Sequence, residues 1–206
     1  HVFDWDSTDK IISLIKHDET IFGRNCTIDY VSADVADRFL NLNHIQGTVS
    51  HQIVCIGLFY ENRLVEIMTF GKPRYSSKYQ WELLRLCSEL GSNVVGGASR
   101  LFKRFIDDMN PESIISYCNR AKFKGDVYTK LGFKYVRTNS PTKWWSKASR
   151  VISDTLLRQR GYDQLFGTNY GKGTSNEQLM IDNWWLPVYD CGQAVYELNS
   201  TKADLR

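Results

Sequence analysis

The sequence predicts an α+β domain built around a mixed β-sheet. Stretches with helical and strand-like apolar patterns follow one another in the order helix, hairpin, strand, helix, strand, helix, strand, which is typical of this class. The strongest local signal is the hairpin, because two apolar runs, 51–60 and 63–71, flank the polar pair Glu61-Asn62. The chain has 206 residues, of which 42% are hydrophobic, and this suits one domain with appendages.

The N-terminal part predicts two helices and a strand. A short helix is expected within 7–17, and 25–32 is strand-like. Residues 32–44 predict a second helix, because apolar side chains recur on one side, Ser32 can cap its N-terminus and Gly47 can end it.

The middle of the chain supplies the rest of the sheet. Residues 81–90 fit a strand or a helix, and their length and the glycines after them favour a strand. A helix that Pro111 closes is predicted by the spacing of Leu101, Phe102, Phe105, Ile106 and Met109. Residues 113–118 predict a short buried strand, and 124–137 predict a helix that stops at Gly132 and is followed by a strand.

The character of the sequence changes after Pro141. Residues 149–161 and 174–185 predict helices, and two short strands are expected around Asp190-Cys191-Gly192. We therefore expect an N-terminal segment at 1–24, a core at 25–140 and a C-terminal extension at 141–206 packed on the core.

Composition limits the function classes. A net charge of +3 permits nucleic-acid binding without implying it. The five cysteines lack the close pairing of a zinc site, so we expect no metal, reduced thiols and a cytoplasmic setting. No run approaches the ~20 apolar residues that span a bilayer, so no membrane association is expected.

A strand, a glycine-rich turn and a helix meet at "SNVVGGASRLFKRF" (92–105), an order that proteins use to hold phosphate. The first-turn N–H groups of a helix have no partner within it, and the small residues let an anion approach them. The stretch is neither a Walker loop nor a Rossmann fingerprint. Tight packing between strand and helix is the alternative.

Two motifs resemble the GNAT acyltransferase family. Asn93-Val-Val-Gly96-Gly-Ala98 resembles its pyrophosphate loop [Q/R]-x-x-G-x-[G/A], with an uncharged Asn in first place, and "VYTKLGFKYV" (127–136) resembles its later helix–strand element. The resemblance implies a mostly antiparallel sheet with a splayed centre and flanking helices. It also implies acetyl-CoA or CoA as the ligand, bound by Asn93, Val94, Val95, Gly96, Gly97, Ala98 and Ser99.

A wider series of segments, "NHIQG", "MTFGKPR", "WELLRLC" and "IISYCNR" among them, is similar to the Mom-type branch of phage DNA-modification proteins. That resemblance implies transfer of an acetyl-CoA-derived group to the exocyclic amine of adenine in DNA. It assigns the charged site residues to His44, Glu82 and Arg85, and Tyr128 to protonation of the CoA thiolate. Asn119 stands where the family usually has Asp, and an amide is a poor base.

Related domains are attached to phage nucleases, and "HVFDWDSTDKIISLI" (1–15) looks like the end of such a nuclease. The resemblance therefore implies that this chain is the C-terminal part of a longer phage protein, with an upstream nuclease domain or partner, in the host cytoplasm.

Structural roles compete with these assignments. His44 can cap a helix, and Tyr128 can be a core residue. Glu82 and Arg85 are three apart and would face opposite sides of a regular strand, unless a β-bulge brings them together; otherwise they suit a structural ion pair.

Basic loop residues flank the proposed site, and solvated loops are their default explanation. If they converge, they form a phosphate-tracking surface of Lys72, Arg74, Arg120, Lys122, Lys124, Lys143, Lys147 and Arg150, with Trp144 and Trp145 as stacking candidates. Three functions remain open: a base-modifying transferase, a non-catalytic nucleic-acid-binding or targeting domain of a phage nuclease, and an ordinary N-acetyltransferase for a small amine or protein.

Overall fold

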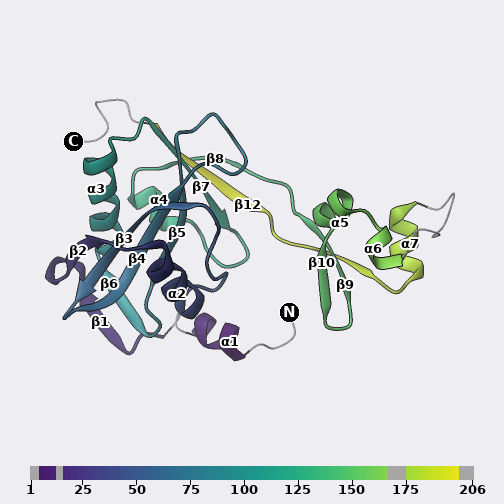
Figure 1. Cartoon of the computed structure of the whole chain (residues 1–206), viewed down its shortest axis with the longest axis horizontal. Coiled ribbons are helices and arrows are strands. Elements are labelled where there is room, and N and C mark those ends of the chain that lie inside the picture. The colour runs from purple at the N-terminus through teal and green to yellow at the C-terminus, as the bar shows by residue number, and fades with distance from the viewer. Residues whose placement is uncertain (1–4, 13–15, 167–174, 200–206) are drawn as a thin grey trace. The chain divides into compact units, whose positions relative to one another are not determined.

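The computed structural model describes residues 5–12, 16–166 and 175–199 (Figure 1). The chain divides into two compact units. The larger unit comprises the described parts of 3–118, 124–137 and 194–206, and the smaller unit comprises those of 119–123 and 138–193. No helix in the described ranges is long and apolar enough to cross a membrane.

A seven-stranded sheet in the order β2-β3-β4-β5-β7-β12-β8 forms the larger unit (Figure 1). The neighbours from β2 to β5 pair antiparallel, and β5 pairs parallel with β7. The predicted α+β class, with a mostly antiparallel sheet flanked by helices, is confirmed. The strands are β2 (Thr27–Tyr30), β3 (Gln52–Tyr60), β4 (Arg63–Gly71), β5 (Trp81–Ser88), β7 (Ser113–Asn119), β12 (Gln193–Asn199) and β8 (Lys134–Thr138).

The two faces of this sheet carry different helices. Leu101, Phe102 and Phe105 of α3 (Gly97–Met109) pack into the main core, and α4 (Asp126–Lys130) packs against the same core. The helix α2 (Ala33–Asn43) instead packs on side chains from the other face of β3, β4 and β5. We call these the α3 face and the α2 face.

Several sequence predictions for this unit are confirmed. Glu61 and Asn62 both have positive φ, 50° and 65°, as a two-residue hairpin turn requires. The Ser32 hydroxyl accepts a hydrogen bond from the Val35 N–H and caps α2. The helix α1 (Trp5–Ile12) overlaps the predicted region 7–17 but begins two residues earlier, and residues 13–15 of that region fall outside the described ranges. The strand β1 (Glu19–Phe22) pairs parallel with β6 (Ser92–Val95). The sequence analysis predicts a strand before the glycine-rich turn, where β6 lies, but it does not predict β1.

The smaller unit has its own sheet and core. Its three strands are β9 (Lys143–Lys147), β10 (Arg150–Ser153) and β11 (Leu186–Tyr189), in the order β10-β9-β11. The helices α5 (Asp154–Arg160), α6 (Asp163–Phe166) and α7 (Asn176–Asp182) complete it (Figure 1). Its core contains Trp145, Leu157, Tyr162, Met180 and Trp185.

Two predictions in this region need correction. The helix expected at 149–161 begins only at Asp154, because Val151 and Ile152 pair with β9 and the Ser153 side chain caps α5. Two strands do flank Asp190-Cys191-Gly192, but they belong to different sheets, because β11 joins the smaller sheet and β12 joins the larger one.

Candidate active site at the opening between two strands

The parallel strands β5 and β7 separate partway along their length. Their recorded pairs end at Leu83↔Ser116, although β5 continues to Ser88 and β7 to Asn119. The Ser116 hydroxyl donates to the Leu83 carbonyl at 2.9 Å, at the last pair before the separation. Beyond this point the described residues show no pairing between β5 and β7, so the two strands leave an opening.

A β-bulge at Leu84 places Glu82 and Arg85 on the same face. Phe70 pairs with Leu83 and Thr69 pairs with Arg85, so Leu84 is the extra residue on β5. Glu82 and Arg85 therefore both lie on the α2 face, although they are three residues apart. The bulge that the sequence analysis required is confirmed.

Glu82 is held by Arg74. Its side chain is fully buried and accepts hydrogen bonds from the Arg74 backbone N–H at 2.8 Å and from two guanidinium nitrogens at 3.0 and 2.6 Å. A carboxylate bound in this way is fixed in position. Arg74, which the sequence analysis predicts among the nucleic-acid contacts, forms an ion pair with Glu82.

Arg85 has no carboxylate partner recorded in the described part of the chain. Its guanidinium donates to the Gly47 carbonyl at 3.2 Å and the Leu84 carbonyl at 2.9 Å. Burial lowers its pKa, and the charge of Arg74 contributes in the same direction. An arginine nevertheless stays protonated, so Arg85 is a half-buried cation with donors left for an anion.

Tyr128 lies at the point where β5 and β7 separate. Its hydroxyl hydrogen-bonds with Ser116, the last paired residue of β7, and its ring stacks on Tyr196 at 4.9 Å between centroids. Burial raises its pKa, so it remains protonated at neutral pH and can donate a proton. The nearby positive charge of Arg85 opposes that shift.

His44 and Asn119 have local structural roles. His44 is the C-cap of α2, and its Nδ1 accepts from the Gln46 N–H at 3.1 Å. The Asn119 side chain accepts from the Ala121 N–H at 2.9 Å and shapes the turn after β7. The described residues include no group of three His, Cys, Asp or Glu side chains that could hold a metal ion.

The two glycines before α3 serve different purposes. Gly96 is in the left-handed conformation (φ 76°), and a Cβ there would meet no atom within 4 Å. Gly97 is buried, and a Cβ there would overlap the carboxylate of Glu66. Gly96 therefore leaves open space at the surface, whereas Gly97 makes room for a buried side chain.

Part of the α3 N-terminus is covered by the segment before β2. A Cβ on Gly23 would lie 2.9 Å from the Gly97 nitrogen, and the Arg100 guanidinium donates to the carbonyls of Gly23 and Cys26. Asn93, Val95, Gly96 and Ser99 are exposed, whereas Val94 and Gly97 are buried. The open side of this loop is therefore at Gly96, Ala98 and Ser99.

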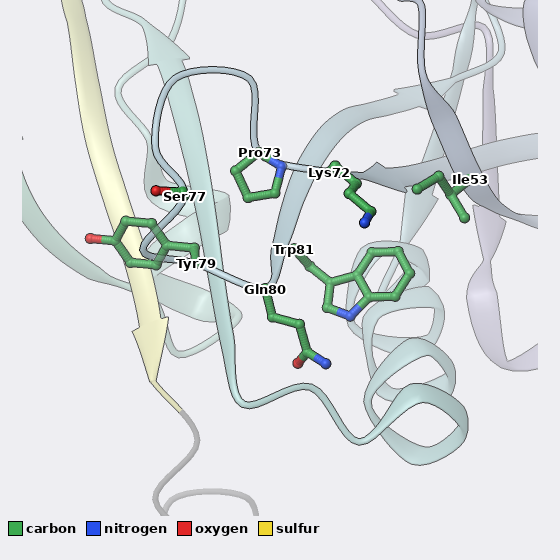
Figure 2. Close-up of a pocket in the computed structure, with 7 residues that line it drawn as sticks. All are labelled: Ile53, Lys72, Pro73, Ser77, Tyr79, Gln80 and Trp81. Carbon is green, nitrogen blue, oxygen red and sulfur yellow. The ribbon is translucent and has the colours of Figure 1, made fainter.

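The other predicted basic and aromatic residues are spread over both units. Lys72 lines a pocket beside the start of β5 (Figure 2), whose other walls are Ile53, Pro73, Ser77, Tyr79, Gln80 and Trp81. Lys143 is bound to Glu177 at 3.0 Å. The expectation that Trp145 stacks on bases is wrong, because it is fully buried and its indole N–H donates to Asp154 at 2.7 Å. Arg120, Lys122 and Lys124 lie in exposed positions.

Sequence reasoning missed three residues near the site. Tyr117 lies beside Glu82 on the α2 face, and burial followed by the Glu82 charge raises its pKa. Tyr75 packs edge-on against Tyr117 at 5.5 Å and lies under the Arg74 guanidinium at 5.4 Å. Glu66 is nearly fully buried in β4, and one of its oxygens has no hydrogen-bond partner among the described residues. Tyr117 comes two residues after Ile115, which pairs with Glu82, but that pairing is visible only in the structure.

Comparison with known proteins finds structural likeness without sequence relatives. No family model and no curated protein matches the sequence. A Bacillus subtilis acetyltransferase in complex with CoA is 12% identical, with a TM-score of 0.49, over 85% of this chain and 99% of that one. The Escherichia coli ribosomal-protein-S18-alanine N-acetyltransferase is 9% identical, with a TM-score of 0.49, over 84% and 93%. A GNAT family acetyltransferase from Elizabethkingia anophelis with acetyl-CoA bound is 12% identical, with a TM-score of 0.45, over 85% and 99%.

Proposed function

We propose that this chain is an acyl-CoA-dependent transferase that modifies an exocyclic amine of adenine in nucleic acid. The observation that carries the proposal is the opening between β5 and β7: Tyr128 lies where the strands part, on the α3 side, and the charge of Arg85, which lies on the α2 face, acts on it. The GNAT-like and Mom-like sequence segments agree with this placement.

The coenzyme would be held by backbone groups more than by charged side chains. Its pyrophosphate would lie on the open side of the loop at Gly96, Ala98 and Ser99, where the α3 dipole favours an anion. The rest of it would follow the separated edges of β5 and β7. Bound acetyl-CoA supplies a thioester, which is an activated acyl donor.

The side chains around the opening have separable roles. Arg85 would stabilise negative charge that develops as the amine reacts, and one buried donor of this kind contributes about 3–4 kcal/mol. Tyr128, which is protonated at neutral pH, would donate its proton to the departing sulfur. Glu82 forms an ion pair with Arg74, so Glu82 would hold Arg74 in place against Tyr75 and would not act as a free base.

Fewer structural features bear on the acceptor than on the coenzyme. A paired adenine presents its exocyclic amine inside the duplex, so the base would be flipped out or single-stranded. An ordinary small-amine or protein acceptor would give acyl transfer without nucleic-acid binding. A pure binding domain would bind nucleic acid without CoA.

Three measurements on the purified full chain separate these outcomes. Calorimetry with CoA tests the coenzyme site, and absence of binding by folded protein would refute the transferase. Nucleic-acid affinity should fall with salt at a log–log slope of about −3 to −5, for about four to six phosphate contacts.

Incubation with acetyl-CoA and adenine-containing DNA, followed by digestion to nucleosides, should give a deoxyadenosine of altered mass. If wild type gives no adduct and Asn119→Asp gives none, base modification is refuted.

A further inference from the structure

Glu66 is an acid buried beneath the glycine turn that begins α3. Its side chain is 4% exposed, and a Cβ on Gly97, the first residue of α3, would lie 1.8 Å from Glu66 Oε2. Glu66 Oε1 accepts a hydrogen bond from the Ser88 hydroxyl at 3.1 Å, whereas Oε2 has no hydrogen-bond partner among the described residues. Buried polar atoms are usually hydrogen-bonded, so an acid left incomplete at this position calls for an explanation.

The outer side of the same turn is the proposed coenzyme site. Gly96 is the N-cap of α3, and a Cβ there would meet no atom within 4 Å. Gly97, the next residue, instead has its Cβ direction toward Glu66. The proposed pyrophosphate and the Glu66 carboxyl would therefore lie on opposite sides of one turn of backbone. The positive end of the α3 dipole is close to both, so two anions would compete for it.

The groups around Glu66 compensate little of its charge. From β5, Ser88 donates one hydrogen bond, and Cys87 is a thiol whose pKa burial raises to about 12. From the segment before β2, Cys26 is a second thiol whose pKa burial raises. Arg100 of α3 donates to two backbone carbonyls of that segment, and no ion pair joins it to Glu66 in the described part of the chain. Burial accordingly raises the pKa of Glu66 from 4.5 to about 7.

The charge state of Glu66 therefore bears on any anion bound outside the turn. An ionised Glu66 would repel that anion across a thin layer of protein, where charges interact more strongly than in water. A protonated Glu66 would not repel it. Because Glu66 is close to half-protonated at neutral pH, the proton needed for the neutral form can come from solvent at little cost.

We propose that Glu66 couples coenzyme binding to proton uptake, so that its buried carboxyl takes a proton from solvent when a pyrophosphate occupies the outer side of the α3 N-terminus. The inference rests on the proposed function, since it concerns the same coenzyme site, and it adds control of that site by pH. Affinity for CoA is then greatest below pH 7. It falls as pH rises above 7, because the free protein loses the Glu66 proton before the complex does.

The test is calorimetry of the full chain with CoA between about pH 6 and 8.5, with wild type and Glu66→Gln measured side by side. If binding raises the pKa of Glu66 by about one to two pH units, wild-type affinity should fall by about 7- to 20-fold relative to that of the variant over this range. In two buffers with different heats of ionisation at about pH 7, wild type should take up about 0.4–0.5 proton per CoA more than the variant. Comparison with the variant removes the titration of the CoA phosphates, which both proteins share.

Ser88→Ala gives a second measurement that does not depend on the folding of Glu66→Gln. It removes the hydrogen bond that lowers the pKa of Glu66, so the fall in CoA affinity should move to higher pH. Glu112→Gln is the matched control, because Glu112 is an exposed acid, and its pH profile should follow that of wild type.

Three results would count against the coupling. If Glu66→Gln binds CoA with the pH dependence of wild type, or if the fall in affinity stays at the same pH in Ser88→Ala, the inference is overturned and the transferase proposal stands. Much weaker binding by folded Glu66→Gln at low pH would overturn it as well, because a neutral side chain should be equivalent there. Folded wild type that binds no CoA even at low pH would refute the coenzyme site itself, and with it both proposals.

Discussion

Replacement of Glu66 by Gln is expected to abolish a large pH dependence of stability. The Glu66 side chain is 4% exposed and lies against Gly97 at the start of α3, and one of its oxygens has no hydrogen-bond partner in the part of the chain that the structure describes. Burial raises the pKa of Glu66 from 4.5 to about 7, and the hydrogen bond from Ser88 opposes this shift only in part. The other titratable groups near it, Cys26 and Cys87, are buried thiols that stay neutral.

The sign and size follow from proton linkage. Between pH 4.5 and 7 the folded protein keeps the Glu66 proton while the unfolded chain has lost it, so the folded state binds more protons. The free energy of unfolding therefore falls as pH rises through this window. A shift of about 2.5 units at about 1.4 kcal/mol per unit gives about 3 kcal/mol, present below pH 4.5 and lost above pH 7.

The assay is urea unfolding of wild type and Glu66→Gln at several pH values from 4.5 to 8. The variant keeps a neutral side chain of the same shape, so it should gain on wild type as pH rises and exceed it by up to about 3 kcal/mol at pH 8. Glu112→Gln is the control, because Glu112 is exposed, and its profile should run parallel to that of wild type. Parallel profiles for Glu66→Gln as well would refute the reasoning, since they would mean that the buried carboxyl ionises without cost.

The other predictions concern the proposed active site. Arg85→Ala should lower turnover by about 10²–10³ in the deoxyadenosine mass assay while calorimetry shows nearly normal CoA binding; loss of binding instead would mean that the arginine holds the coenzyme. Gly96→Val should weaken CoA binding, because its Cβ would fill the open side of the loop, and the melting temperature should fall slightly because φ is positive. Gly97→Val should unfold the protein in the same melting experiment, because its side chain would overlap a buried carboxylate. Arg74→Ala should destabilise by about 3 kcal/mol in urea unfolding, because Glu82 would be left buried without its partner; an unchanged midpoint would show that water replaces the guanidinium.

The elements with strong local signals could be predicted from the sequence. The β3–β4 hairpin follows from apolar runs around a polar pair, and α3 follows from its helical spacing and Pro111. The sequence left two cases open for Glu82 and Arg85: opposite faces of a regular strand, or one face if the strand has a bulge. Spacing alone does not reveal a bulge. Pairing across β4 decides it, and such pairing depends on residues distant in sequence.

The two tryptophan pairs could not be resolved from the sequence. Trp144 and Trp145 alternate on a strand, so one had to be buried, but which one depends on the helices that cover the sheet. Trp184 and Trp185 follow a helix, and the left-handed turn at Trp184 comes from the Schellman hydrogen bonds, where the sequence offers no glycine as a signal. Tertiary contacts likewise determine which sheet β11 joins and which sheet β12 joins.

The pair Gly96-Gly97 shows why a glycine-rich turn alone is weak evidence of a phosphate site. Gly96 occupies the glycine position of the motif and its Cβ direction is toward open space, whereas Gly97 occupies an unspecified position and makes room for the Glu66 side chain inside the protein. A motif search that counts both as ligand contacts therefore overstates the site by one residue. It also hides a packing constraint, because a Cβ at position 97 would overlap the Glu66 carboxylate and lie 2.7 Å from Val94 Cγ1. The two substitutions predicted above separate these roles, since a ligand requirement should appear in CoA affinity at Gly96 and a packing requirement in stability at Gly97.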